Sequence, residues 1–286
     1  MTPVSHPASP GPAMPPPAPT AAAAGSTAAG PAKGARITAV TSGKGGVGKT
    51  FITANLAAAL ARRGERVLVL DADLGLANID VVLNLYSRLT LHDVFTGRTP
   101  LDEAILPAPG GFSVLLAGSG LVEYSRMTPE VRDKLLEVIG RVRPRYDHVL
   151  LDTGAGISDV VLFTISLADE VLIVATPEPT SLADAYATVK VLAATQSPRP
   201  MKLLVNQTQK SGEGRAVRSQ LQQVVDRFVN ANLPQPVKLD HVGDVPQDTA
   251  VRETVQRRQL LLESLPGSAA AQALVAAAAR LVGDRQ

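Results

Sequence analysis

One short stretch constrains this chain more than any other: Gly43-Lys44-Gly45-Gly46-Val47-Gly48-Lys49-Thr50. It fits the pattern G-x-x-x-x-G-K-[ST], in which a glycine-rich loop follows a strand and opens a helix. The flanking residues supply that setting, because residues 37–41 form an apolar run and residues 50–63 repeat their apolar side chains with helical spacing. The sequence therefore predicts a strand, a phosphate-binding loop and a helix in this order.

The residue types of this loop each have a chemical reason. Glycines permit positive φ and close backbone approach, so a row of N–H groups can point at phosphate oxygens. Lys49 supplies positive charge for the β- and γ-phosphates, and Thr50 offers a hydroxyl to Mg²⁺. The alternative is a glycine turn before a helix capped by lysine. We predict that the nucleotide-binding residues here are Gly43, Lys44, Gly45, Gly46, Val47, Gly48, Lys49 and Thr50.

Composition and pattern predict the fold class. Hydrophobic residues make up 45% of the chain but aromatic residues only 3%, so the core must consist of Val, Leu, Ile and Ala. Such a composition suits buried parallel strands covered by helices. Strand-length apolar runs at 67–70, 112–116, 149–151, 171–175 and 203–205 alternate with helical segments at 91–104, 129–142, 157–168, 180–196, 213–230 and 268–282. We expect an α/β fold, a single doubly wound, mostly parallel sheet with helices on both faces.

The beginning of the chain has a different composition. Residues 1–36 are dominated by Pro, Ala and Gly, which bury too little apolar surface to offset the entropy of ordering. We interpret them as a disordered tail and residues 37–286 as one domain. The chain has no cysteine, which excludes disulfides, thiolate metal sites and iron–sulfur clusters. A net charge of +2 gives no indication of a nucleic-acid partner.

Polar side chains follow three of the apolar runs. Asp71 and Asp73 follow the second strand, Asp152 follows residues 149–151, and Asn206 follows residues 203–205. Ligands bind beyond the carboxyl ends of parallel strands. An apolar strand that ends in aspartate is the usual carboxylate partner of Mg²⁺ opposite the loop threonine, so Asp152 is predicted to bind the metal. A turn or helix-capping aspartate is the alternative.

The pair Asp71 and Asp73 fits a second position beside the phosphates. Two residues apart, they point to the same side of an extended chain, so both are expected to face the site. One of them then orients the attacking water. The alternative is a pair of solvated loop acids.

Lys44, the second residue of the loop, makes the chain resemble the deviant Walker-A ATPases of the MinD/ParA family, over about residues 36–282. The resemblance implies a P-loop NTPase fold, ATP and Mg²⁺ as ligands, and slow hydrolysis of ATP to ADP and phosphate. It also implies an ATP-dependent homodimer in which Lys44 reaches the partner's nucleotide.

The same resemblance assigns further residues. It makes Asp73 the catalytic residue that orients water, with Lys44 and Lys49, and it places Asp71 in the Mg²⁺ shell with Thr50 and Asp152. Asn206 matches the family's adenine-contacting residue. Residues 245–248 are similar to the late loop beside the base, which adds Pro246 and Asp248 to the nucleotide-binding set.

Within that family, residues 71–80, 152–158 and 177–186 resemble the regulators of flagellar number and placement known as FlhG, FleN or YlxH. This implies partners such as an FlhF-like GTPase or flagellar assembly and regulatory proteins. The implied location is the cytoplasm, and the alternative is a peripheral position at the inner face of the cell membrane or at the pole. Residues 268–282 carry one charge, Arg280, so we expect this helix to pack in the core and membrane association to be weak or indirect.

Three other interpretations remain open at this point. One is a MinD-type protein that positions the division site. Another is a ParA-type ATPase that segregates DNA, although we expect no nucleic-acid partner because the candidate basic residues are interspersed with acids. Those candidates are Lys202, Lys210, Arg215, Arg218 and Arg227. The third is a sensor or scaffold that binds ATP without hydrolysing it.

Overall fold

A computed structural model describes residues 34–74, 78–118 and 127–283 of the protein. These described residues form one compact unit. The strands are β1 (Arg36–Ser42), β2 (Val67–Ala72), β3 (Ile105–Pro107), β4 (Ser113–Leu115), β5 (His148–Ala155), β6 (Glu170–Ala175), β7 (Met201–Thr208) and β8 (Leu239–Pro246). They form one sheet in the order β3-β4-β2-β5-β1-β6-β7-β8, and only β3 and β4 pair antiparallel. The predicted fold class is therefore confirmed.

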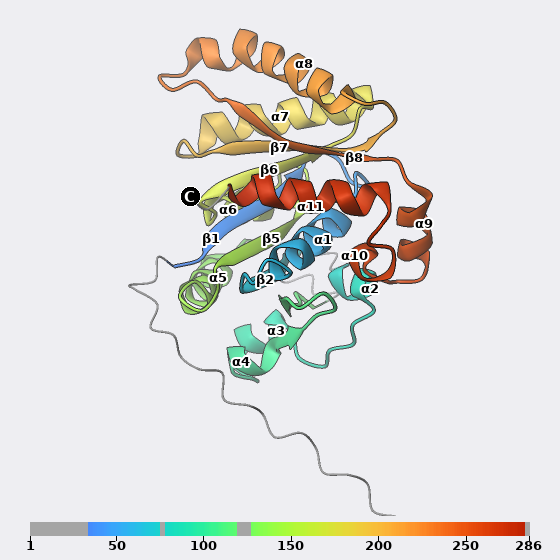
Figure 1. The fold of residues 1–286 in the computed structure, drawn as a ribbon. Helices are drawn as coiled ribbons and strands as arrows, with labels where there is room; N and C mark the ends of the chain where they lie inside the picture. Colours follow the sequence, from blue (N-terminus) through green and yellow to red (C-terminus); the bar gives the residue numbers. More distant parts are fainter. Residues whose placement is uncertain (1–33, 75–77, 119–126, 284–286) are drawn as a thin grey trace, which may run out of the picture. The chain divides into compact units, whose positions relative to one another are not determined.

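Helices cover both faces of this sheet (Figure 1). They are α1 (Lys49–Ala61), α2 (Ile79–Leu83), α3 (Leu91–Phe95), α4 (Leu101–Ala104), α5 (Pro129–Val142), α6 (Asp159–Ser166), α7 (Pro179–Thr195), α8 (Glu213–Phe228), α9 (Thr249–Gln256), α10 (Leu261–Ser264) and α11 (Ala269–Val282), with a short 3₁₀ turn at Asn230–Asn232. One buried cluster joins α5, α6, α7 and α8 to the sheet, and the other joins α1, α10 and α11 to its opposite face. None of the described helices has the length and apolar character needed to cross a bilayer.

The side-chain alternation along β2 shows how the two layers form. Val67 and Val69 belong to the cluster with α1, whereas Leu68 and Leu70 belong to the cluster with α5. Successive strand residues point to opposite faces, so the apolar residues of β2 are buried on both sides of the sheet. Strand β1 lies between β5 and β6, so its carboxyl end lies well inside the sheet, away from both edge strands. The functional loop begins there.

Several sequence-based boundaries need correction. Strand β2 extends through Ala72, so Asp71 lies within the strand and does not follow it. The segment predicted as a late loop begins as strand, because Val245 and Pro246 end β8. This edge strand was not predicted because its alternating polar residues and terminal proline resemble a loop. The predicted disordered tail falls mainly on residues 1–33, outside the described residues; Ala35 is buried and Arg36 opens β1.

Candidate functional site

The glycine-rich loop joins β1 to α1, and tertiary contacts limit its residue choice. Gly48 is the residue before α1 and has φ 94°, a left-handed conformation that favours glycine. A Cβ atom on Gly48 would lie 2.6 Å from Nδ2 of Asn206, and one on Gly43 would lie 2.2 Å from the carbonyl oxygen of Asp184 in α7. The loop is therefore held between β7 on one side and α7 on the other.

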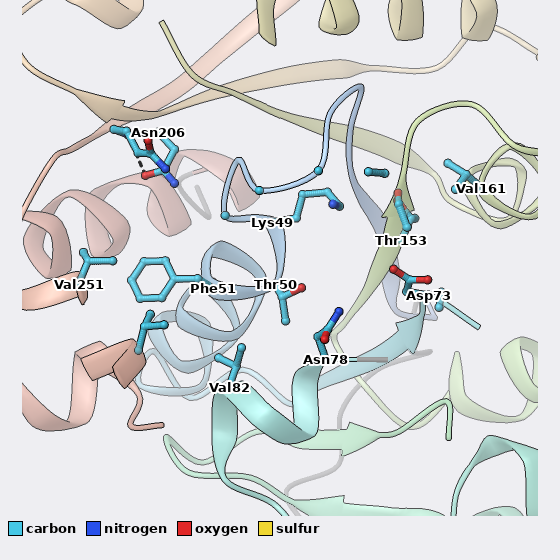
Figure 2. A pocket seen from close by; sticks show the side chains of 18 of the residues that line it. Lys49, Thr50, Phe51, Asp73, Asn78, Val82, Thr153, Val161, Asn206 and Val251 are labelled. Atoms are coloured by element: carbon cyan, nitrogen blue, oxygen red, sulfur yellow. Dashed lines mark hydrogen bonds between the residues drawn. The ribbon is translucent and has the colours of Figure 1, made fainter. Parts of the chain in front are cut away.

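A cavity of about 930 Å³ lies over this helix start. It contains nine of the predicted site residues: Gly45, Gly46, Gly48, Lys49, Thr50, Asp73, Asn206, Pro246 and Asp248. Figure 2 shows Lys49 at the centre, Asn206 on one side, and Asp73 with Thr153 on the other. Such a volume is in the range of small-molecule sites, and α1 contributes the N-terminal N–H groups that bind anions.

The cavity has an apolar wall that sequence reasoning did not find. Phe51 in α1, Val82 in α2, and Val251 and Val255 in α9 line it on the side of Asn206 (Figure 2 labels the first three). These residues come from segments far apart in the chain, and no motif joins them. Their position beside Asn206 suits a planar base, whereas the Lys49 ammonium suits phosphates.

Asn206 and Asp248 both make structural contacts at the cavity. The Asn206 amide donates to the Val47 carbonyl oxygen at 2.8 Å, which ties β7 to the loop. The Asp248 carboxylate accepts from the backbone N–H groups of Ala250 at 2.9 Å and Ala270 at 3.1 Å. Asp248 thus caps α9 and α11 at once, and its predicted contact with nucleotide stays a prediction.

Two of the predicted metal-binding carboxylates lie beneath the cavity. Asp71 and Asp152 are paired neighbours on adjacent strands β2 and β5, and both are buried. Burial raises the pKa of Asp152 to about 6, partly opposed by hydrogen bonds from the Thr50 and Thr53 hydroxyls and by the charge of Lys49. The same burial, together with the Asp152 charge, raises the pKa of Asp71 well above its ordinary value. Thr53 was missed from the sequence, although it lies one helical turn after Lys49.

These carboxylates test whether Mg²⁺ fits. Oδ2 of Asp71 is buried and has no hydrogen-bond partner in the described part of the chain. A buried, unpaired carboxylate oxygen costs free energy, and a cation removes that cost. The described residues contain no group of three His, Cys, Asp or Glu side chains that could hold a metal, so a bound Mg²⁺ would rely on Thr50, Asp71, Asp152 and phosphate oxygens. Mg²⁺ in nucleotide sites is commonly held this way, and the residues fit it.

Lys49 lies between these acids and the cavity. Desolvation lowers the pKa of Lys49, and the charges of Asp152 and Asp73 raise it in part. The side chain is half-buried and lines the cavity, so it contributes a partly desolvated positive charge to the space for phosphates. Asp73 lies beside the backbone of Gly154, since a Cβ atom there would be 3.4 Å from Oδ1 of Asp73.

Lys44 has a different position from the rest of the loop. Its ammonium donates to Oε2 of Glu178 and Oγ1 of Thr180, both at 3.1 Å, and its side chain is 41% exposed. It does not line the cavity, and neither do Gly43 and Val47. In this single chain Lys44 thus makes no approach to the space that Lys49 faces.

We expect replacement of Asp152 with asparagine to stabilise the protein without ligand at pH 8. The sign follows from the raised pKa of Asp152. The raised pKa contributes stability that is fully present below pH 3.8, the ordinary pKa, and is lost as the pH rises through about 6. Asparagine cannot ionise, so the variant should avoid this destabilisation, which is on the order of 3 kcal/mol at pH 8 and small at pH 4. Thermal unfolding at both pH values measures the difference.

The matched control for this variant is Asp133→Asn, on the exposed face of α5. It removes the same charge without a buried carboxyl. Equal Tm changes for the two variants at pH 8 would contradict the burial argument. The asparagine at 152 should also weaken Mg²⁺-dependent nucleotide binding, because an amide is a poorer Mg²⁺ ligand than a carboxylate.

Known proteins with this arrangement are similar over most of their length. A family model described as ParA, NUBPL iron-transfer P-loop NTPase, matches residues 34–282. The antiactivator FleN of Pseudomonas aeruginosa is 40% identical over 246 residues, 86% of each chain. The flagellum site-determining protein YlxH of Helicobacter pylori is 31% identical over 86% of this chain and 82% of its own.

Solved structures agree with this similarity. The septum site-determining protein MinD of Pyrococcus horikoshii, complexed with Mg-ADP, has a TM-score of 0.70 at 27% identity and covers 86% of this chain and 96% of its own. MinD in the MinC:MinD complex of Aquifex aeolicus has a TM-score of 0.68 at 29% identity, over 88% and 97%. Members of the group therefore bind Mg-nucleotide and form protein complexes. Together with the loop, Lys44 and the strand-end aspartates, these matches show that the chain belongs to the MinD/ParA family of P-loop ATPases.

Proposed function

We propose that this protein is a slow, Mg²⁺-dependent ATPase whose ATP-bound form is a homodimer, and that the dimer regulates flagellar number and placement. The position of Lys44 is the observation that carries this proposal. A loop lysine that is 41% exposed and held by Glu178 and Thr180, outside its own cavity, is placed to reach another molecule. A second copy of the chain would bring its own Lys44 to this cavity.

We propose a role for each of the chain's site residues. Loop N–H groups and Lys49 bind the phosphates, and the wall of Phe51 and Val251 with Asn206 holds the base, in keeping with their places in the cavity lining. Thr50, Asp71 and Asp152 would hold Mg²⁺, which would neutralise phosphate charge. Asp73 orients the water that attacks the γ-phosphate. Because phosphoryl transfer depends on positioning and charge stabilisation, hydrolysis limits how long the dimer persists.

The flagellar role rests on the relatives FleN and YlxH and on the three matching segments. With this role, the proposed location is the cytoplasm, at times at the inner membrane face or pole. The proposed partners are an FlhF-like GTPase or flagellar assembly and regulatory proteins. Counting flagella on cells that lack this protein tests the role. Unchanged number and placement would refute it and favour the MinD-type alternative, division-site positioning, which mislocalised septa would reveal.

The ParA-type alternative loses support from the side-chain contacts. Lys202 donates to Oε2 of Glu170 at 2.8 Å and to the Leu281 carbonyl, and Arg218 donates to the Leu239 carbonyl at 2.8 Å. Two of the five candidate basic residues are therefore used inside the fold.

We expect Lys44→Ala to impair dimerisation while leaving ATP binding nearly intact. The truncated side chain removes a charge that the partner's phosphates need, and an interfacial charge of this kind is worth roughly tenfold or more in dimer affinity. Light scattering with ATP measures the dimer, and fluorescent nucleotide titration measures binding. The exposed Lys190 in α7 provides the control Lys190→Ala. A Lys44→Ala protein that dimerises with ATP like the control would overturn the proposed switch.

A further inference from the structure

A second cavity, of about 640 Å³, lies along the free edge of β8, between α8 and α11. It is separate from the nucleotide cavity, although Pro246 lines both. The side chains that matter here are basic: Lys210 and Arg215 from the α8 side, and Arg280 from α11. None of them has a role in the proposed ATPase reaction.

An irregularity in β8 builds one wall of this cavity. Leu203 of β7 pairs with His241 and Leu204 pairs with Gly243, so Val242 is an extra residue in the ladder. Residues 241 and 244 would point to opposite faces of a regular strand. The bulge turns them to the same side, where Nε2 of His241 lies 2.6 Å from Oδ1 of Asp244.

A glycine in α8 completes the same wall. A Cβ atom on Gly214 would lie 1.6 Å from Oδ1 of Asp244, so only glycine allows this carboxylate to approach the first turn of α8. The bulge in β8 and the glycine in α8 are two independent features, and both shape the wall of this cavity. The same carboxylate lies within hydrogen-bond distance of the His241 ring.

The remaining charges leave the cavity positive. Lys210 and Arg215 make no ion pair in the described part of the chain, and Arg280 uses one nitrogen to donate to the Val242 carbonyl at 3.1 Å. Glu213 is turned back to accept from the backbone N–H groups of Gln209 and Lys210. The first turn of α8, a helix of 16 residues, lies beside the same cavity, with Glu213 in that turn and the Asp244 carboxylate against it.

From this arrangement we propose that the cavity is a second ligand site, for a small phosphate-bearing molecule. Three basic side chains that line one cavity, Lys210, Arg215 and Arg280, match the charge and hydrogen-bond needs of a phosphate group, and all three are exposed to an incoming ligand. The volume suits a small ligand. Duplex DNA fits less well, because its phosphates need cations along an extended surface, whereas these three line a single hollow. A ligand bound there would contact β8 close to Pro246, the residue of this strand that also lines the nucleotide cavity.

Inorganic pyrophosphate is the probe for this site. Calorimetric titration uses the full chain saturated with ADP in magnesium-free buffer, so that the loop is already occupied. We expect saturable binding that weakens roughly tenfold or more in Lys210→Gln/Arg215→Gln, since each lost charge-assisted hydrogen bond removes affinity. The control Arg141→Gln/Lys190→Gln loses the same charge on exposed faces of α5 and α7 and should bind like the parent protein.

Two further arms separate the sources of phosphate. A short DNA duplex and vesicles of phosphatidylglycerol are tested against the same variants under the same conditions. Absent pyrophosphate binding, or equal binding by the variant and control pairs, would overturn the site. Binding of DNA or vesicles that depends on Lys210 and Arg215, in place of pyrophosphate binding, would also overturn it. ADP affinity of each variant, unchanged from the parent, shows that the fold and nucleotide site are intact.

Discussion

Lys49→Ala is expected to reduce ATP affinity at least about 30-fold, because truncating one partner of a desolvated charge pair typically costs roughly 2–5 kcal/mol. Lys49 lines the cavity, and Asp152 and Asp73 are the charges that act on it. Without its ammonium, incoming phosphates meet two aspartates and no compensating side chain from the loop. Calorimetric or fluorescent nucleotide titration with Mg-ATP measures the loss.

Lys44→Ala is the matched control, since it removes the same charge from the same loop. Lys44 is paired with Glu178 outside the cavity, so this variant should bind ATP within about threefold of the parent protein. Thermal unfolding without nucleotide checks that the Lys49 variant is folded. A folded Lys49→Ala protein with unchanged ATP affinity would show that the loop does not bind phosphate.

Asp73→Ala is expected to have the second large effect, a loss of hydrolysis with retention of ATP. Asp73 lines the cavity at its phosphate side, beside Gly154. A residue that orients or deprotonates the attacking nucleophile contributes on the order of 100- to 10,000-fold in rate. Phosphate release should fall by at least the lower figure, while nucleotide titration should show ATP bound.

The same variant tests the dimer directly. If hydrolysis ends the dimer, Asp73→Ala with Mg-ATP should remain dimeric for as long as ATP is present, and with ADP it should be monomeric. Asp80→Asn is the control and should hydrolyse ATP like the parent protein, because Asp80 is a half-buried carboxylate in the first turn of α2 that does not line the cavity. A monomeric Asp73→Ala protein in ATP would separate ATP binding from dimerisation and defeat the proposed switch.

Much of the fold was predictable because local sequence encodes it. The helix at 129–142 begins and ends where its capping threonine, first-position proline and apolar spacing place it. The alternation of apolar runs and helices led to the doubly wound sheet. The edge strand β8 was missed, since a strand with one neighbour tolerates polar residues and proline that are typical of loops.

The site divides in the same way. The loop from Gly43 to Thr50 follows from residue chemistry, because glycine conformations, a lysine and a hydroxyl at fixed spacing are local requirements. The apolar wall did not follow, because Phe51, Val82 and Val251 meet only when distant segments pack. The sequence spacing predicts that Asp71 and Asp73 both face the site. In the structure only Asp73 lines the cavity, whereas Asp71 is buried under it within β2.

Lys44 shows the limit most clearly. Its place in the loop is a matter of sequence, but the direction of its side chain depends on Glu178 and Thr180, more than 130 residues away in the chain. Motifs specify which chemical groups are present and how the backbone between them turns. Long-range packing and burial specify where each group points and how strongly its charge is expressed, because both depend on neighbours that no local pattern contains.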